Sequence, residues 1–532
     1  DMAITKVTSD LLNSTALTSK AFGTSSIMIG DDATGTIDAA NYNVGLGVDV
    51  FAALTTGDSN LAVGYQALNA NTTGSFNTAL GENSLLLNTT GSTNTAVGSR
   101  SLDENTTGSS NTAVGQGALN KNTTADNNTS VGQGSLAANT TGASNTAVGA
   151  TSMDANTTGG SNTSLGKDSL GANTTGSSNV ALGHNSLENN TTADNNTAVG
   201  KSALGANTTG TGNTATGMRA LVANTTGDSN VSFGKDSLYT NTTGSENTAI
   251  GTNALEGNTT ASYNTAIGKN SLKANTTGNY NVAFGRHTLD ANTTGTANTA
   301  LGAAALGANT TAGSNTAVGF AAMEANTTGA NNTALGRGSL GSNLTADSNV
   351  AVGYLALNLN TTGTENVVVG ANALDASTTG SYNVALGRSA LGSSTTASNN
   401  TAVGYTALFA NTTGTQNTAL GRSALAANTT GNYNTALGYT AGTAITTGGY
   451  NVAVGHGCLD EATTGGNNTA VGASAMGSGV TTGNDNTCIG TAAGFNITSA
   501  SNSMMLGHDA GRTGSPGGLM TTQVNTIVLG DE

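Results

Sequence analysis

Two consecutive stretches decide the fold of this chain: NTALGENSLLLNTTGST at residues 77–93 and NTAVGSRSLDENTTGSS at residues 94–110. The second repeats the first with few changes, and the phrase N-T-A-V-G or a close variant returns every 17 residues from Ser26 to Asn468. We number positions 1 to 17 from the residue that starts each copy, and we call the same position in successive copies a row. Self-similarity at a short fixed period is the signature of a repeat fold.

The composition agrees with this interpretation and excludes ordinary globular domains. The 532 residues include 76 Gly, one Pro and no Trp, and only 8% are charged. Such a composition is typical of either a disordered low-complexity chain or a stack of small residues in register. The unbroken period favours the stack.

Each copy has the size of one solenoid coil. The consensus N-[TV]-[AS]-[VLI]-G-x-x-[AS]-L-x-x-N-T-T-[GA]-x-x is too short and too rich in Gly, Asn and Thr for a helical repeat. We expect two short strands per coil, T-A-V and A-L-x-x-N-T-T, with a turn at the Gly of position 5. The prediction is an all-β parallel β-solenoid, or β-roll, of about 27–30 coils.

Rows of equal residues should lie along the rod. The large aliphatic residues at positions 4 and 9 are predicted to form the core, and the asparagines are predicted to form hydrogen-bonded ladders. Ala or Ser at positions 3 and 8 demands close approach, either within one coil or at a subunit axis. Representative core and ladder residues are Leu80, Val97, Leu85, Leu119, Asn77, Asn94 and Asn111.

The predicted organisation has three parts. Residues 1–25 lack the repeat and are expected to cap the open end or attach the chain to a larger particle. Residues 26–484 form the regular shaft, and residues 485–532 form irregular C-terminal coils and a second cap. Two large side chains per coil make a thin core, so we also expect the solenoid to be stabilised by association with other chains.

The repeat N-T-A-V-G-x-x-A-L-x-x-N-T-T-G resembles repeats of phage tail-fibre-like proteins, and it is similar to the shorter repeats in trimeric autotransporter adhesin heads. This resemblance covers residues 26 to about 530, and it implies a homotrimeric fibre. MAITKVTSDLL at residues 2–12 resembles the start of some phage structural proteins, which implies attachment to other virion or tail proteins. NTIVLGDE at residues 525–532 resembles the last repeat before a self-cleaving chaperone domain.

Cations and aromatic residues gather at two outward positions and suggest a surface-binding stripe for a host-surface glycan. The alternatives are a solvated face without a ligand and pairing with acidic rows of another subunit. The candidate residues at position 6 are Lys167, Lys201, Lys235, Lys269, Arg286, Arg337, Arg388 and Arg422, and those at position 17 are Tyr263, Tyr280, Tyr433 and Tyr450.

Several classes of function are not indicated. The formal charge of −15 is spread thinly and no basic cluster exists, so no nucleic acid is expected as a partner. No apolar run is long enough to span a bilayer. The four His and two Cys are separated along the rod and no catalytic motif appears, so we expect no enzyme activity, no metal and no cofactor.

The leading hypothesis is a structural fibre of a virion, either a phage tail fibre or a related appendage, acting as a rigid shaft and host-surface adhesin outside the cell. A start at Met2 without a cleaved signal favours it. The alternative is a trimeric adhesin on a bacterial cell surface. A minor alternative is an ice-binding solenoid, which the sequence disfavours because the Thr pair at positions 13 and 14 should alternate faces.

Overall fold

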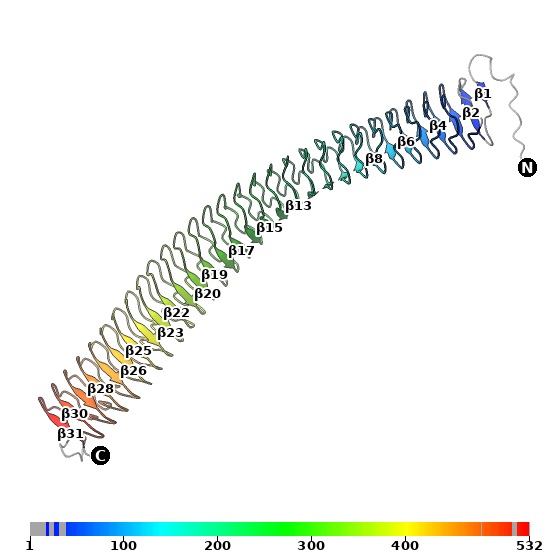
Figure 1. The fold of residues 1–532 in the computed structure, drawn as a ribbon. Coiled ribbons are helices and arrows are strands. Elements are labelled where there is room, and N and C mark those ends of the chain that lie inside the picture. The colour runs from blue at the N-terminus through cyan, green and yellow to red at the C-terminus, as the bar shows by residue number, and fades with distance from the viewer. Residues whose placement is uncertain (1–17, 21–25, 31–38, 480, 513–518, 531–532) are drawn as a thin grey trace, which may run out of the picture. The chain divides into compact units, whose positions relative to one another are not determined.

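The chain divides into two compact units, residues 1–262 and 263–532, which we call unit 1 and unit 2 and describe separately (Figure 1). The computed structural model describes residues 18–20, 26–30, 39–479, 481–512 and 519–530.

Unit 1 contains a stack of short strands, one for each coil (Figure 1). They are β1 (Thr18–Lys20), β2 (Ile27–Gly30), β3 (Val44–Leu46), β4 (Leu61–Val63), β5 (Thr78–Leu80), β6 (Thr95–Val97), β7 (Thr112–Val114), β8 (Thr129–Val131), β9 (Thr146–Val148), β10 (Thr163–Leu165), β11 (Val180–Leu182), β12 (Thr197–Val199), β13 (Thr214–Thr216), β14 (Val231–Phe233) and β15 (Thr248–Ile250).

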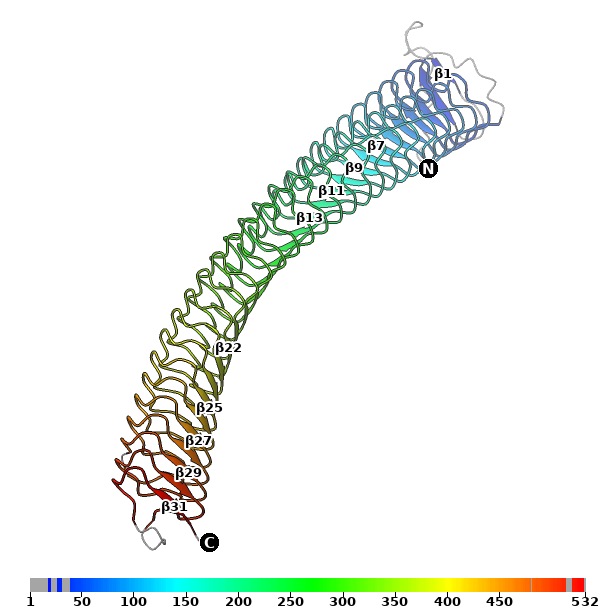
Figure 2. The same ribbon diagram turned by 60° about the vertical axis from the view of Figure 1, so that its left-hand side comes forward.

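Unit 2 repeats the same arrangement, which Figure 2 shows from a second side. Its strands are β16 (Thr265–Ile267), β17 (Val282–Phe284), β18 (Thr299–Leu301), β19 (Thr316–Val318), β20 (Thr333–Leu335), β21 (Val350–Val352), β22 (Val367–Val369), β23 (Val384–Leu386), β24 (Thr401–Val403), β25 (Thr418–Leu420), β26 (Thr435–Leu437), β27 (Val452–Val454), β28 (Thr469–Val471), β29 (Thr487–Ile489), β30 (Met504–Leu506) and β31 (Ile527–Leu529).

Neighbouring strands within each unit pair in parallel and in register with the sequence repeat. In β5 and β6, for example, Thr78 lies opposite Thr95 and Leu80 lies opposite Val97. The described residues contain strands and turns but no helix. The predicted all-β parallel solenoid with a 17-residue repeat is therefore confirmed.

The edge of the sheet at the N-terminal end is paired in the opposite direction. Strand β1 runs antiparallel to β2, with Ser19 opposite Ile29. A paired edge strand offers fewer free backbone groups to other chains. The rest of the predicted cap, residues 1–17 and 21–25, lies outside the described residues.

Each coil contains one strand of three or four residues, so the expectation of a second strand over positions 8–14 is wrong. Asn83 at position 7 has φ 55° and Leu85 at position 9 has φ 52°, both left-handed conformations that interrupt an extended run. The segment still bonds to the next coil, because Leu85 N–H donates to the Ser101 carbonyl at 3.0 Å and Thr89 N–H to the Thr106 carbonyl at 2.8 Å. Stacked turns thus replace the predicted second sheet.

The position-4 row lies on the outer face, so its assignment to the core is also wrong. Leu80 is 37% exposed and Val97 is half-buried, whereas Ala79 and Ala96 at position 3 are fully buried. Successive strand residues point to opposite faces, so a three-residue strand with its middle residue inside must place positions 2 and 4 outside. The core is built from the small residues of rows 3 and 8 and the large residues of row 9, which include Leu85 and Leu119.

Small residues at positions 3 and 8 approach each other inside the same coil. Where both are serine, the hydroxyl of Ser164 donates to the carbonyl of Ser169 at 2.9 Å, and Ser232 and Ser237 form the equivalent bond at 3.0 Å. Most coils have Ala or Ser at position 3, although Val368 is fully buried at the same position. Of the two explanations for the small rows, close approach within one coil is the observed one.

Two buried asparagine rows connect the coils. At position 1, Asn94 N–H donates to Asn77 Oδ1 at 3.0 Å, and Asn111 N–H donates to Asn94 Oδ1 at 3.0 Å. At position 12, Asn88 Nδ2 donates to Asn71 Oδ1 at 2.8 Å. The two rows converge on one acceptor, since the Nδ2 groups of Asn77 and Asn88 both donate to the Gly91 carbonyl, at 2.9 and 3.0 Å.

Glycine at position 5 is required by the corner that follows each strand. Gly98 has φ 131°, and a Cβ atom there would lie 2.6 Å from the carbonyl of Gly115 in the next coil. A side chain would therefore be strained and would also separate the coils. This corner directs position 6 outward, where the candidate cations lie.

Candidate functional site

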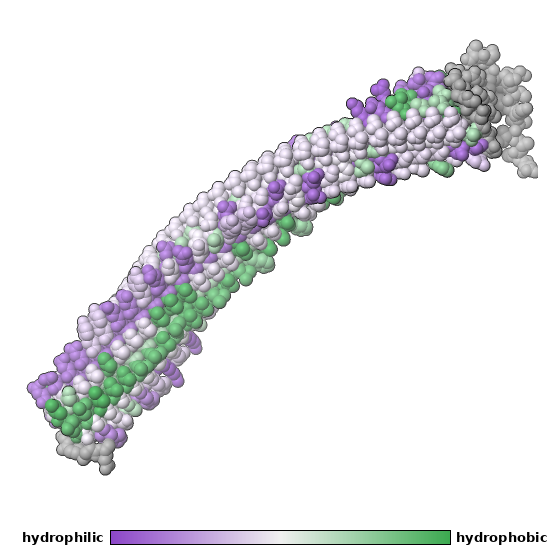
Figure 3. Space-filling model, in the orientation of Figure 1, coloured by the Kyte–Doolittle hydropathy of each residue, from purple (hydrophilic) through white to green (hydrophobic). Residues whose placement is uncertain are grey.

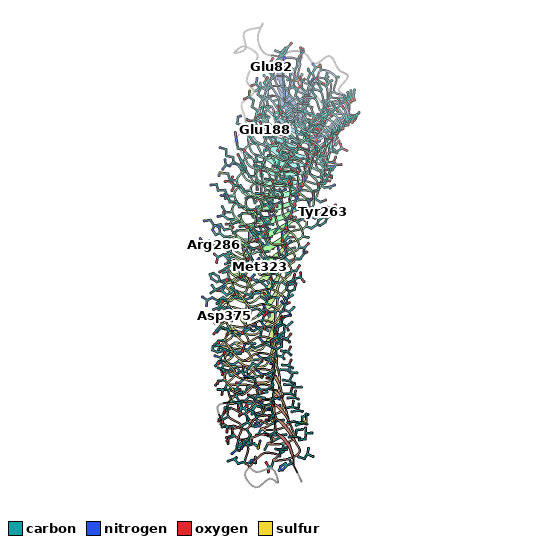
Figure 4. All side chains as sticks on the ribbon, turned by 90° about the vertical axis from the view of Figure 1, so that its left-hand side faces the viewer. Glu82, Glu188, Tyr263, Arg286, Met323 and Asp375 are labelled. Atoms are coloured by element: carbon teal, nitrogen blue, oxygen red, sulfur yellow. The ribbon has the colours of Figure 1, made fainter. Side chains whose placement is uncertain are left out.

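The predicted surface-binding residues occupy two rows at opposite borders of the outward strand face. Row 6 follows the strand after the Gly corner, and row 17 precedes it. All the candidate lysines, arginines and tyrosines are exposed. In Figure 4, Tyr263 of row 17 and Arg286 of row 6 lie on opposite sides of the ribbon, and Met323 of row 9 lies within it. The predicted stripe therefore consists of two separate rows.

Row 17 residues adopt a left-handed backbone conformation, which turns each side chain away from the rod. Tyr263 has φ 62° and Tyr280 has φ 59°. Their rings stack with centroids 5.0 Å apart, and the rings of Tyr433 and Tyr450 stack at 4.6 Å. These four tyrosines of row 17 are thus held in two pairs, with one face of each ring covered by its partner.

In unit 1, two lysines of row 6 and one arginine of row 7 are paired with aspartates of row 7. Lys167 forms an ion pair with Asp168, and Lys235 lies 3.6 Å from Asp236. Arg219, itself in row 7, binds the same Asp236 through two bonds of 2.8 and 2.9 Å. Hydrogen bonds from Lys167 and then Thr151 hold the pKa of Asp168 below its usual value. These cations are already occupied within the chain.

In unit 2, row 6 forms a ladder of alternating cations and aromatic rings. The guanidinium carbon of Arg337 lies 5.9 Å from the Phe320 ring centroid and 5.8 Å from that of Tyr354. Arg422 lies in the same way between Tyr405, at 5.8 Å, and Tyr439, at 5.5 Å. These distances are within the range of cation–π attraction.

The ladder continues by one coil before Tyr405 and by one coil after Tyr439, the two rings that flank Arg422. Arg388 lies 5.9 Å from the other side of Tyr405, and His456 stacks on Tyr439 with centroids 5.3 Å apart. Three of the partner rings, Tyr354, Tyr405 and Tyr439, share position 6 with the candidate cations and are visible there in the sequence. The fourth ring, Phe320, was missed, although it occupies the same position of the repeat.

A second surface feature, the outward rows 2 and 4 of unit 2, was also missed. We call these side chains the apolar face, and Figure 3 shows it as a continuous hydrophobic band along the strands of unit 2. Monomeric soluble proteins rarely expose a contiguous apolar patch of this extent. Its most exposed members include Phe284, Leu301, Leu335, Val369, Leu420, Leu437, Ile489 and Leu529.

Titratable groups inside the coils are perturbed by burial. Both cysteines are buried and free, and burial raises the pKa of Cys458 and of Cys488 to about 12. Burial is also the main cause that raises the pKa of the row-10 carboxyls of Asp154 and Asp375 above the usual value. Both thiols are therefore protonated at neutral pH and are poor nucleophiles.

The part of the chain that the structure describes contains no cluster of three or more His, Cys, Asp or Glu side chains arranged to hold a metal ion. In the same part, no helix has the length and apolar character needed to cross a membrane. The surface features that bear on function are the exposed rows described above.

Comparison with known proteins identifies no relative: no family model matches the chain, and no curated protein matches it.

Proposed function

We propose that this protein is the structural shaft of a homotrimeric fibre, carried outside the cell on a virion and directed at a host surface. The observation that supports it best is the apolar face, which runs along the strands of unit 2 on the outside of the solenoid. A large exposed apolar face of this kind is typical of a surface that is buried against a partner.

Another copy of this chain is the partner that fits the apolar face best. A partner that covers every coil must repeat with the same axial spacing, which is about 4.8 Å for stacked strands. A second copy in parallel register meets this condition in each coil, because equal rows then lie at equal heights. The number three, the virion and the attachment through the N-terminus rest on the resemblance to phage tail-fibre repeats; a bacterial surface adhesin is the alternative with the same shaft.

The mass of the native particle tests the proposal. Light scattering should give three times the chain mass of 51.7 kDa. The double variant Leu420→Asp/Leu437→Asp places two charges on the apolar face and should dissociate the particle, because burying an unpaired charge is costly. The matched control Thr413→Asp/Thr430→Asp adds the same charges at exposed position 14 and should leave the mass unchanged. A monomeric native protein would refute the fibre.

Ice binding is a second candidate, and one observation in unit 1 favours it. The Thr residues of row 2 point outward from β5 to β10, and they form a regular row of hydroxyl and methyl groups. The Thr hydroxyls of row 13 are used within the rod, since Thr89 Oγ1 donates to the Thr106 carbonyl at 2.9 Å. The row-2 residues are Thr78, Thr95, Thr112, Thr129, Thr146 and Thr163.

Thermal hysteresis of the freezing point tests this candidate. An ice-binding row would give hysteresis that Thr129→Lys abolishes and that Thr141→Lys, at exposed position 14, leaves intact. Absence of hysteresis in the unaltered protein removes the candidate and leaves the fibre proposal untouched.

A further inference from the structure

Nine successive coils of unit 2 carry an ordered pattern at position 6. Aromatic residues and arginines alternate along most of this row, and one alanine interrupts it. The residues are Phe320, Arg337, Tyr354, Ala371, Arg388, Tyr405, Arg422, Tyr439 and His456. We call this set the arginine–aromatic row.

The arginines of this row are positioned by ring contacts. Arg337 and Arg422 each lie between two rings, at 5.5–5.9 Å from the centroids, and Arg388 lies 5.9 Å from Tyr405. All three arginines are exposed. Contacts on the faces of a guanidinium leave the N–H groups at its edge free to donate in the plane.

No acidic partner neutralises these arginines. Among the described residues, no carboxylate lies within ion-pair distance of Arg337, Arg388 or Arg422, in contrast to the pairs of Lys167 and Lys235 in unit 1. Row 7 holds no acidic residue from Ala304 to Ser474, and the nearby acidic residues fall at other positions of the repeat. Those between Phe320 and His456 are Glu324, Asp347, Glu365 and Asp375.

We propose that the arginine–aromatic row binds a linear acidic polysaccharide, with its carboxylate or sulfate groups on Arg337, Arg388 and Arg422. Planar guanidinium groups recognise such anions through paired hydrogen bonds. Arg388 and Arg422 are two coils apart, or about 10 Å, and Arg337 and Arg388 are three coils apart, or about 14 Å. A polysaccharide with one charge per disaccharide has charges at a comparable spacing.

The geometry favours contacts to charged groups over other modes of binding. Both faces of Tyr405 are covered by arginines, and Tyr439 lies between Arg422 and His456, so these rings have no free face for a sugar or a nucleobase. Nucleic acid is also disfavoured as a ligand, because the chain has a net charge of −15 and this row offers only three arginines to neutralise phosphates. The exposed edges of the guanidinium groups and the tyrosine hydroxyls are left to make the contacts.

This inference deepens the proposed host-directed role and rests on it for its biological setting. Its chemistry is independent of the number of chains in the particle. Binding and particle mass are therefore measured on the same samples, so that a failure of one proposal is distinguished from a failure of the other.

The experiment measures binding of the full chain to immobilised hyaluronan, which carries carboxylates, and to heparin, which carries sulfates and carboxylates, with neutral dextran as the blank. The test variant is Arg337→Gln/Arg388→Gln/Arg422→Gln. The matched control is Lys167→Gln/Lys201→Gln/Lys235→Gln, which removes three cations from the same row of unit 1. Circular dichroism verifies that each variant retains its fold.

We expect the arginine variant to lose affinity for at least one acidic polysaccharide by at least about tenfold. The lysine variant should change it by less than about twofold. Replacing the three arginines by lysine should restore only part of the affinity, because lysine keeps the charge and lacks the planar fork. A preference for hyaluronan or for heparin identifies the anion.

Three results would overturn the inference. The first is no binding of the unaltered protein to either acidic polysaccharide, and the second is an equal loss in the lysine variant, which would indicate net charge alone. The third is a change of particle mass in the arginine variant, which would make the row a contact between subunits.

Discussion

Units 1 and 2 are built on the same inward rows but stabilise their row-6 cations in different ways. In unit 1, Lys167 and Lys235 are paired with neighbouring aspartates. In unit 2, Arg337 and Arg422 lie between aromatic rings of the coils before and after them. The difference teaches that the buried rows set the repeat, and that the residues of each outward row can differ in their chemistry from one unit to the other.

The largest effect should come from the interior and be equal in both units. Leu204→Ala in unit 1 and Leu408→Ala in unit 2 remove fully buried row-9 side chains, and each should cost about 2–5 kcal/mol of local stability. Hydrogen exchange of the altered coil measures this, because long repeats do not unfold in one step. Leu359→Ala, at an exposed site, is the control. A loss confined to one unit would contradict a shared interior.

The second largest change in local stability should come from repairing a break in the position-12 asparagine ladder of unit 2. Ser377 and Ser394 replace the asparagines there, and their hydroxyls are buried without a hydrogen-bond partner. Ser377→Asn/Ser394→Asn should restore the ladder and add about 1 kcal/mol per site, measured by hydrogen exchange in these coils. No gain in protection would show that the ladder stabilises unit 2 less than unit 1, where position 12 is Asn from Asn71 to Asn258.

The difference in stability between the row-6 cations of the two units should be smaller. Arg422→Ala removes two cation–π contacts and should cost about 0.5–1 kcal/mol, whereas Lys201→Ala at an exposed site of unit 1 should be close to neutral. Raising the salt concentration should weaken the Lys167–Asp168 pair of unit 1 more than the ring contacts of unit 2. Equal costs for the two alanine variants would remove the distinction between the units.

The smallest effect concerns the row-10 carboxyls, where the units should behave alike. Burial raises the pKa of Asp154 and Asp375 in the folded chain, so the folded state binds more protons than the unfolded state between the unfolded and folded pKa values. Local stability should therefore fall as pH rises through the folded pKa. Asp154→Asn and Asp375→Asn should each stabilise their coil near pH 7 and flatten this dependence. A destabilised variant would contradict desolvation as the main cause.

Much of the fold could be predicted from the sequence because the same residue types recur at the same positions in many copies of the repeat. The period identified the coil and the parallel register, the Asn rows indicated the ladders, and Gly at position 5 indicated a corner. Row 9 was correctly placed in the core. The candidate cations of row 6 were also found, but Phe320 was missed and the stacking of the arginines between rings was not foreseen.

Two features depended on the tertiary structure. The strand T-A-V can bury either its middle residue, at position 3, or its first and last residues, at positions 2 and 4. Hydrophobicity alone favoured burial of the larger residue at position 4. In the folded coil the middle residue lies inside, since Ala79 is fully buried and Leu80 is 37% exposed. The left-handed conformations of Asn83 and Leu85 replace a second strand by turns. Asn, Asp and Gly, which tolerate this conformation, recur at position 7, whereas Leu at position 9 gives no such signal.

The sequence by itself thus determined that this chain is a β-solenoid of 17-residue coils, since a fixed period of small and polar residues has few other ordered solutions. Only the tertiary structure decided which rows face outward and which residues meet between coils. Contacts such as those of Arg422 with Tyr405 and Tyr439 join residues 17 apart, and they exist because stacking places equal positions next to each other.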